Sequence, residues 1–161
     1  MPIAVGSRLP DVTFRVIVDG KGIDMTTADV FAGKKVALFA VPGAFTPTCH
    51  LKHLPGFLAN IDVFRARGID TVACTSVNDH HVMSAWAKAT GADGRLLMLA
   101  DGTAAFAKGM GLTSDMGPLS LRSERYAAYV KDGVLQVLLI EANSGRAETS
   151  SAEALLAAMP A

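Results

Sequence analysis

Two cysteines occur among the 161 residues of this chain, and the first stands in a rigid setting. Cys49 lies within VPGAFTPTCHLKHLPGF, residues 41–57, a stretch that holds three prolines and two glycines. The thiolate of a cysteine is a strong nucleophile, and the groups around it set its reactivity. A stiff loop is one means of fixing such groups around a sulfur. The alternative is that Cys49 is a small apolar side chain that fills space, as many free cysteines do.

The elements around Cys49 favour the reactive interpretation. Residues 34–43, KKVALFAVPG, form a nearly continuous apolar run that ends in Pro-Gly, which is typical of a buried central strand leading into a loop. A helix is predicted from about residue 47 to residue 67, interrupted or kinked near Pro55-Gly56. Loops at the carboxyl ends of such strands commonly carry ligand sites. Cys49 is therefore predicted to lie where a binding site is expected.

The predicted start of this helix places Cys49 in its first turn. If Thr46 is the N-cap, Pro47 takes position N1, where proline is favoured, and Cys49 takes N3. There the sulfur lies near unpaired backbone N–H groups and the positive end of the helix dipole, which favour the thiolate over the thiol. The Thr46 hydroxyl could reach the sulfur or a molecule bound to it. Pro42 and Pro47 hold the loop stiff and could shield one side from water.

Strands and helices alternate along the rest of the chain. A β-α-β unit followed by a hairpin and a last helix is the order of a thioredoxin-like fold. We therefore predict one α/β domain over residues 1–161, with a central mixed β-sheet flanked by helices and an N-terminal β-hairpin. The predicted elements are a hairpin over 12–25, strands over 68–77 and 95–101, helices over 78–91 and 103–110, a hairpin over 125–141, and a closing helix over 150–159 with Ser150 as its cap and Glu153 at the capping-box spacing.

Composition argues against several classes of function. The 15 Lys and Arg residues balance 15 Asp and Glu residues, so there is no basic excess to bind nucleic acid or an anionic membrane. No uncharged apolar run reaches about 18 residues, so no transmembrane helix is predicted. The N-terminus, MPIAVGSRLPDVTF, is unlike a signal peptide. Two cysteines do not make a disulfide scaffold, and we expect a reducing, cytoplasmic setting.

The wider stretch around Cys49 resembles a known family. Pro42, Thr46 and Cys49 reproduce the P-x-x-x-T-x-x-C active-site pattern of the peroxiredoxins. The surrounding PGAFTPTCHLKHLPGF is similar in particular to the peroxiredoxin-5 and plant type II subfamily. The resemblance covers nearly the whole chain, because three later segments are similar to that subfamily in the same order: ACTSVNDHHVMSAW (73–86), RSERYAAYVKDG (122–133) and TSSAEALL (149–156).

This resemblance implies a thiol-dependent peroxidase. Cys49 would be the peroxidatic cysteine, whose thiolate attacks hydrogen peroxide or an organic hydroperoxide, becomes a sulfenic acid and releases water or an alcohol. Thr46 would hydrogen-bond the peroxide and the thiolate, and Pro42 would shield the site. The arginine of the family falls on Arg125, which would stabilise the thiolate and the charge on the leaving oxygen. Spacing alone does not choose Arg125 over Arg122.

The second cysteine bears on how the sulfenic acid is reduced. Members related to animal peroxiredoxin 5 carry a resolving cysteine near the C-terminus, but that region here reads RAETSSAEALL. The chain is more similar to plant and bacterial members, which have a second cysteine where Cys74 stands. Cys74 lies in a predicted buried strand, where a thiol has a raised pKa and is inert, so we interpret it as structural. The alternative is an intramolecular Cys49–Cys74 disulfide, which needs Cα atoms within about 7 Å.

With a structural Cys74, an external thiol must reduce the enzyme. The resemblance implies glutathione with glutaredoxin as the first choice and thioredoxin as the second. It implies no haem, flavin or metal, and so no cofactor besides the reductant. It also implies a non-covalent homodimer formed near the active-site face.

Other classes of function compete with this one. Cys49, His50 and His53, with His80 and His81, suggest a metal site, but adjacent ligands on a helix point in different directions. Histidines that cover a helix surface or a pocket rim are the simpler interpretation. A dithiol oxidoreductase of the thioredoxin type is disfavoured because the chain has no C-x-x-C pair. A non-enzymatic thioredoxin-fold interaction or chaperone module remains as an alternative, and the intact active-site pattern speaks against it.

Overall fold

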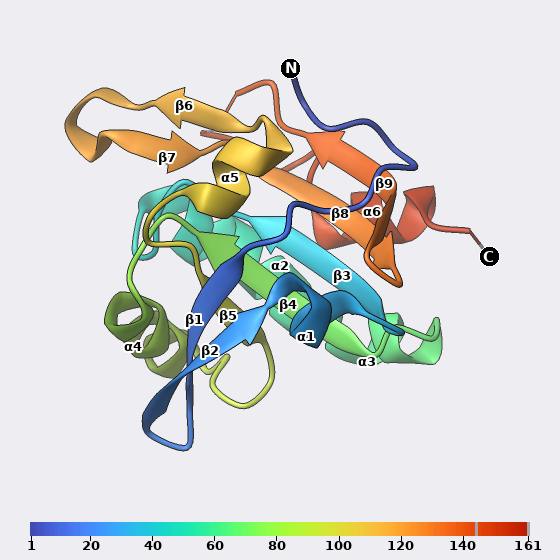
Figure 1. The fold of residues 1–161 in the computed structure, drawn as a ribbon, viewed down its shortest axis with the longest axis horizontal. Coiled ribbons are helices and arrows are strands. Elements are labelled where there is room, and N and C mark those ends of the chain that lie inside the picture. Colours follow the sequence, from blue (N-terminus) through green and yellow to red (C-terminus); the bar gives the residue numbers. More distant parts are fainter. Residues whose placement is uncertain (144, 161) are drawn as a thin grey trace.

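A mixed sheet is the framework of this computed structural model, which describes residues 1–143 and 145–160 (Figure 1). Within those residues, seven strands lie in the order β2-β1-β5-β4-β3-β8-β9. Two further strands, β6 and β7, form a separate small sheet. The bounds are β1 Thr13–Val18, β2 Lys21–Thr26, β3 Lys35–Ala40, β4 Thr71–Ser76, β5 Leu97–Ala100, β6 Thr113–Asp115, β7 Leu121–Ser123, β8 Tyr126–Lys131 and β9 Val134–Ile140.

The middle of the sheet is parallel and its outer pairings are antiparallel. β3, β4 and β5 run parallel, and every residue of β3 after Lys35 is buried. Burial on both faces explains why this strand is a continuous apolar run in the sequence. The β1–β2 and β8–β9 hairpins each turn on an Asp-Gly pair whose φ angles lie between 50° and 78°. Such turns require positive φ at both central residues.

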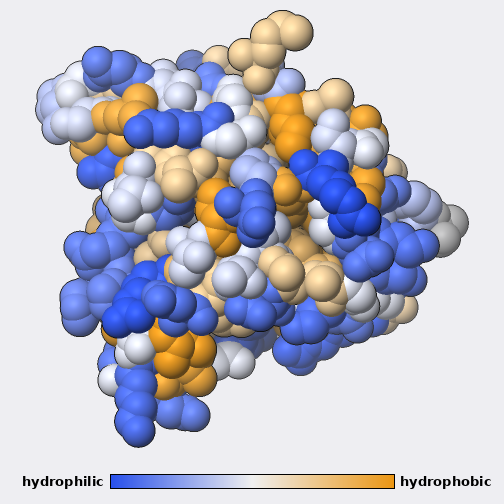
Figure 2. All heavy atoms as spheres, viewed as in Figure 1, coloured by the Kyte–Doolittle hydropathy of each residue, from blue (hydrophilic) through white to orange (hydrophobic). Residues whose placement is uncertain are grey.

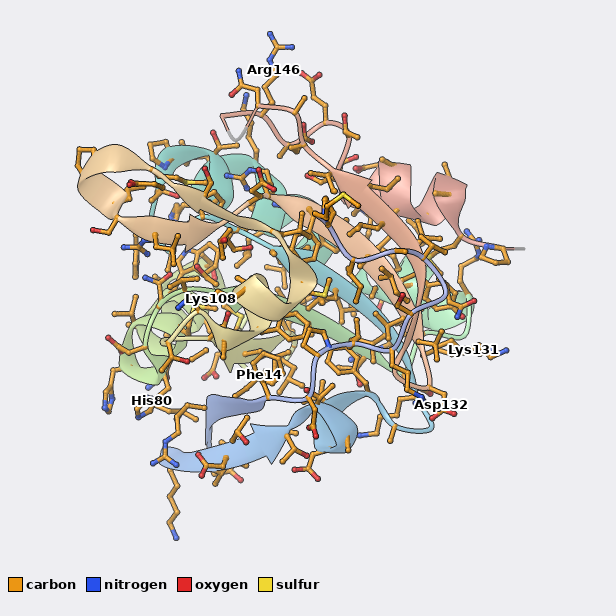
Figure 3. The ribbon with its side chains drawn as sticks, turned by 45° about the horizontal axis from the view of Figure 1, so that its top comes forward. Phe14, His80, Lys108, Lys131, Asp132 and Arg146 are labelled. Atoms are coloured by element: carbon orange, nitrogen blue, oxygen red, sulfur yellow. The ribbon has the colours of Figure 1, made fainter. Side chains whose placement is uncertain are left out.

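Helices cover both faces of the sheet and divide the core in two. On one face, α2, α3, α4 and α6 bury side chains that include Phe57, Phe64 and Trp86. On the other face lie α1 and α5, where Phe14 of β1 packs on Phe106 with ring centroids 5.0 Å apart (Figure 3). The helix bounds are α1 Thr27–Phe31, α2 Leu54–Ala59, α3 Ile61–Ala66, α4 His80–Thr90, α5 Ala105–Met110 and α6 Ala152–Ala158, with a π-helical turn η1 over Cys49–His53 and a 3-10 turn η2 over Gly117–Leu119.

The surface in view is predominantly polar. Among the described residues, hydrophobic side chains show on this face only as separate small groups between hydrophilic ones (Figure 2). In the described part of the chain, no helix has the length and apolar character needed to cross a membrane.

The predicted thioredoxin-like fold is confirmed, and the predicted helix over 47–67 needs a correction. Helical geometry begins at Pro47, but η1 follows, in which the Leu54 N–H bonds to the Cys49 carbonyl. The expected irregularity near Pro55-Gly56 is present just before the proline, where η1 gives way to α2, and Pro55 stands in the first turn of α2, where a missing N–H is tolerated. A second break, which was not predicted, lies at Asn60 between α2 and α3.

Candidate active site

Cys49 lies beyond the carboxyl end of β3. The strand ends at Ala40, residues 41–46 form a loop, and Cys49 is the first residue of η1, fully buried. Turns of this π type occur frequently at functional sites. Thr46 holds the predicted position just before the first helical residue, and its hydroxyl donates to the Gly43 carbonyl oxygen at 2.6 Å.

Arg125 is the cation that contacts the sulfur. Its Nη2 atom donates to Cys49 Sγ at 2.9 Å, and the arginine is only 2% exposed. A guanidinium has donors alone, so the sulfur accepts, which is the role that a thiolate fills best. Arg122 bonds to backbone carbonyls: Nε donates to the Leu119 carbonyl at 2.7 Å and Nη1 to the Val77 carbonyl at 2.9 Å. The contact geometry thus chooses between two arginines that spacing could not separate.

His53 is a buried part of the site, and its role beside Arg125 was not predicted from the sequence. Arg125 Nη1 donates to His53 Nδ1 at 2.8 Å, so the ring proton sits on Nε2, which donates to the Ser150 carbonyl at 2.8 Å. Burial, and then the charge of Arg125, lowers the pKa of His53 to about 3, against an opposing effect of the Ser150 bond. The ring is therefore neutral at pH 7. Its spacing of four residues from Cys49, on one side of the helix, is the signal that points to it in the sequence.

The hydrogen bonds continue from His53 to the start of α6. Ser150 donates through its N–H and its hydroxyl to Glu141 Oε1, at 2.8 and 3.0 Å, and the Glu141 N–H donates to the Arg125 carbonyl at 3.0 Å. The prediction that Ser150 caps α6 is wrong. Ser151 is the N-cap and accepts from the N–H three residues on, because Ser150 is fully buried and committed to Glu141 and His53.

A hollow of about 490 Å³ lies at the mouth of the site. Pro42, Thr46 and Arg125 all line it, and Arg125 links it to Cys49. The structure thus brings together the four residues that the sequence indicated. Another wall comes from the β6–β7 hairpin, which sequence analysis did not predict because its three-residue strands carry too short a pattern. The residues of this wall are Ser114, Asp115, Met116 and Leu119.

Cys74 is a second fully buried thiol in the same core. It lies on β4 opposite Phe39 of β3, in the cluster that also contains Cys49. Burial raises the pKa of the Cys74 thiol well above its ordinary value, the nearby Cys49 raises it further, and Arg125 opposes the rise. Both cysteines are free in the structure. A protonated, buried thiol fits the structural role predicted for Cys74.

The histidines suggested as metal ligands are engaged with other partners. His50 Nδ1 accepts from Trp86 Nε1 at 3.0 Å, and both nitrogens of His53 are bonded as described above. The rings of His80 and His81 contact each other in a tilted arrangement with centroids 4.1 Å apart, and Figure 3 shows His80 at the edge of the molecule. Among the described residues, no group of three or more His, Cys, Asp or Glu side chains is arranged to hold a metal ion.

Comparisons with known proteins agree with this geometry. The Redoxin family model matches residues 4–156. The chain is 45% identical to peroxiredoxin-2E-2, chloroplastic, of Oryza sativa subsp. japonica, over 98% of this chain and 72% of that protein. It is 38% identical to peroxiredoxin-2B of Arabidopsis thaliana, over 98% of this chain and 99% of the relative.

Solved structures give the same result. This chain is 46% identical in sequence to reduced Prx3 from Vibrio vulnificus, whose crystal structure in complex with H2O2 superposes with a TM-score of 0.92. The match covers 97% of this chain and 98% of the Prx3 chain. Peroxiredoxin 5 from Alvinella pompejana is 34% identical, with a TM-score of 0.84 and 97% of each chain covered. Family, identity and fold agree. The chain belongs to the peroxiredoxins, of the plant type II and peroxiredoxin-5 kind, and is a thiol-dependent peroxidase.

Proposed function

We propose that Cys49 is the peroxidatic cysteine. The Cys49 thiolate donates an electron pair to the terminal oxygen of a hydroperoxide, an S–O bond forms, and the O–O bond breaks. The sulfur is oxidised by two electrons to a sulfenic acid, and the peroxide is reduced. The leaving oxygen takes up a proton and departs as water from hydrogen peroxide or as an alcohol from an organic hydroperoxide.

The observation that carries this proposal is the 2.9 Å contact between Arg125 Nη2 and the buried Cys49 Sγ. A fixed guanidinium there stabilises the thiolate and then the negative charge on the leaving oxygen. Thr46 lines the hollow, where its hydroxyl oxygen can accept a hydrogen bond from the bound peroxide. Pro42 is buried beneath the same hollow and shields the sulfur from bulk water. His53 holds the second arm of Arg125.

Intact mass of the reduced protein after one equivalent of hydrogen peroxide, without added thiol, tests this role. We expect the protein to gain one oxygen, located on Cys49 by peptide mapping, and Cys49→Ser to gain none. The alternative mechanism, an intramolecular Cys49–Cys74 disulfide, would give a loss of two hydrogens instead. Oxygen gained on another residue, or none at all, would contradict the assignment. The non-enzymatic alternative is not favoured, because the family is one of peroxidases.

We propose that an external thiol reduces the sulfenic acid. The thiol condenses with it to a mixed disulfide and water, and a second thiol then releases the Cys49 thiolate. The burial and raised pKa of Cys74 support this over a Cys74 route. Glutathione with glutaredoxin is the proposed donor, and thioredoxin the second choice. Peroxide consumption measured with each donor system separates them. No haem, flavin or metal takes part, because the sulfur itself supplies both electrons.

We further propose a homodimer and a cytoplasmic setting. Leu119, which lines the hollow, is 39% exposed, and Phe45, the residue before Thr46, is 49% exposed, and a non-covalent partner would cover them. Sedimentation of the reduced protein measures the assembly. Two free cysteines fit a reducing compartment. The rice relative named above is chloroplastic by name, so the compartment is not shared by all members.

A further inference from the structure

His50, the residue after Cys49, is held at three points. Its backbone N–H donates to the Thr46 carbonyl at 2.9 Å. Its ring Nδ1 accepts from Trp86 Nε1 of α4 at 3.0 Å. Its ring also stacks on Phe45, with centroids 5.8 Å apart and planes 20° apart. Because the indole N–H can only donate, the His50 proton must sit on Nε2. One side chain thus ties the turn that carries the sulfur to a helix and to the preceding loop.

Phe45 shows why such a tie is needed. Its φ of 65° lies in the left-handed region, which is unfavourable for a bulky side chain and persists only where neighbouring structure imposes it. The residue before it is fixed, since the Ala44 N–H donates to Asn78 Oδ1 at 3.0 Å. The stack on His50 fixes the residue itself. The loop that presents Thr46 to the hollow is therefore held both at Ala44 and at Phe45, the residue with the unfavourable φ angle.

We propose that His50, with Phe45 and Trp86, forms a latch that holds the Cys49 turn closed. Cys49 is fully buried while Arg125 contacts it, so neither a protein or peptide thiol nor a small thiol such as dithiothreitol can reach its sulfur in this arrangement. If an external thiol reduces the sulfenic acid, as the proposed function on which this inference rests holds, the first turn must open once in each cycle. Opening moves the residue next to Cys49 and so breaks the His50–Trp86 bond and the stack on Phe45. His50 is accordingly a positioning residue that favours peroxide capture and opposes reduction by thiols.

Two substitutions separate the effect of the His50–Trp86 hydrogen bond from that of the ring stack on Phe45. His50→Phe keeps a ring against Phe45 but offers Trp86 no acceptor. His50→Asn keeps the acceptor, because the Asn oxygen and His Nδ1 are attached to the same side-chain carbon. His81→Ala is the control, an exposed histidine on the same helix as Trp86. Each variant is oxidised with hydrogen peroxide, and the sulfenic acid is then reduced with dithiothreitol, both steps followed by quenched-flow mass spectrometry.

For His50→Phe we expect reduction by dithiothreitol to accelerate about three- to tenfold, the factor that one net hydrogen bond makes in an opening equilibrium. Oxidation by peroxide should not accelerate, since it uses the closed turn. Emission of Trp86, the single tryptophan, should shift in reduced His50→Phe, while His50→Asn and His81→Ala should match the unaltered protein. Unchanged reduction of His50→Phe, or equal slowing of both steps, would overturn the latch. Failure of the unaltered protein to form any sulfenic acid would instead overturn the proposed function, and the emission comparison would still test the His50–Trp86 bond.

Discussion

Replacement of Arg125 by alanine should slow the oxidation of Cys49 by hydrogen peroxide far more than any other change of a single cation. Arg125 gives one N–H to the sulfur and a second to His53, and both partners are buried. Removing one preorganised donor to a developing negative charge costs about 2.7–4 kcal/mol of transition-state stabilisation, or about 10²–10³ in rate. We therefore expect Arg125→Ala to be slower by about that factor.

Arg125→Lys tests whether charge alone is sufficient. Lysine keeps the positive charge but lacks the planar fork that reaches Cys49 and His53 together, so its rate should fall between those of the alanine variant and the unaltered protein. Arg122→Ala is the matched control. That side chain bonds to the carbonyls of Leu119 and Val77, so its loss loosens the wall of the hollow without removing the cation at the sulfur.

The assay is quenched-flow mass spectrometry of the one-oxygen adduct at several peroxide concentrations, with thermal unfolding to confirm that each variant is folded. A folded Arg125→Ala whose second-order rate stays within about tenfold of normal, a difference below about 1.4 kcal/mol, would refute the reasoning. A larger loss in Arg122→Ala than in Arg125→Ala would do the same.

Four further predictions concern stability and the second thiol. The pKa of His53 is about 3 in the folded state and near 6.5 in the unfolded chain, so the unfolded chain takes up the proton first as pH falls. Protonation of His53 should therefore lower the free energy of unfolding by about 1.4 kcal/mol per pH unit between about pH 6.5 and pH 3. In urea unfolding of His53→Gln, the free energy of unfolding should lack this part of its dependence on pH. The same pH dependence in His53→Gln as in the unaltered protein would contradict a buried, neutral His53 ring. Cys74→Ala should still gain one oxygen on Cys49 with one equivalent of peroxide, and loss of that product by intact mass would show that Cys74 takes part. Ser151→Ala should lower the free energy of unfolding by about 1 kcal/mol through loss of the α6 cap. Glu141→Ala should cost about 1–3 kcal/mol, since it leaves two buried donors of Ser150 unpaired, and equal effects of the two changes in urea unfolding would argue against this distinction.

The parts of the fold that were predictable are those with local signals. The hairpins follow from Asp-Gly pairs, β3 from its unbroken apolar run, and α4 from a cap at Asn78 or Asp79 and a stop at Gly91, of which the structure uses Asp79 and a left-handed Gly91. The π-helical turn at Cys49 has no comparable local signature in the sequence. Ser150 shows the same limit. Its spacing from Glu153 matches a capping box, and a buried glutamate nine residues upstream outweighs that local preference.

The residues of the candidate site that could be predicted from local sequence are those of one short segment. Pro42, Thr46 and Cys49 lie within eight residues of one another, and their pattern carried the resemblance. His53 lies four residues from Cys49, but the sequence predicts it only as a metal ligand or as a histidine of a helix surface or pocket rim, because spacing cannot show its contact with Arg125. Glu141 could not be inferred, since its role depends on where β9 ends relative to α6.

Strand register explains how an arginine 76 residues from Cys49 reaches the sulfur. Ala40, the last residue of β3, lies opposite Tyr126, the first residue of β8, so Arg125 stands one step beyond the end of β3, where the Cys49 loop begins. Side chains alternate along β8: Tyr126 enters the α1–α5 core and Ala127 the opposite core, which contains Cys49.

Arg125 therefore shares the face of Cys49, and a slip of one residue would turn its side chain to the other face. The far end of the pairing is pinned by Asp132 (Figure 3), whose N–H donates to the Lys34 carbonyl at 2.9 Å and whose carboxylate accepts from the Gly33 N–H at 2.6 Å. The turn residue that closes the β8–β9 hairpin thus also fixes the register that delivers Arg125. The cation at the sulfur is a consequence of sheet pairing, which is why spacing alone could not choose Arg125 and only the family resemblance pointed to it.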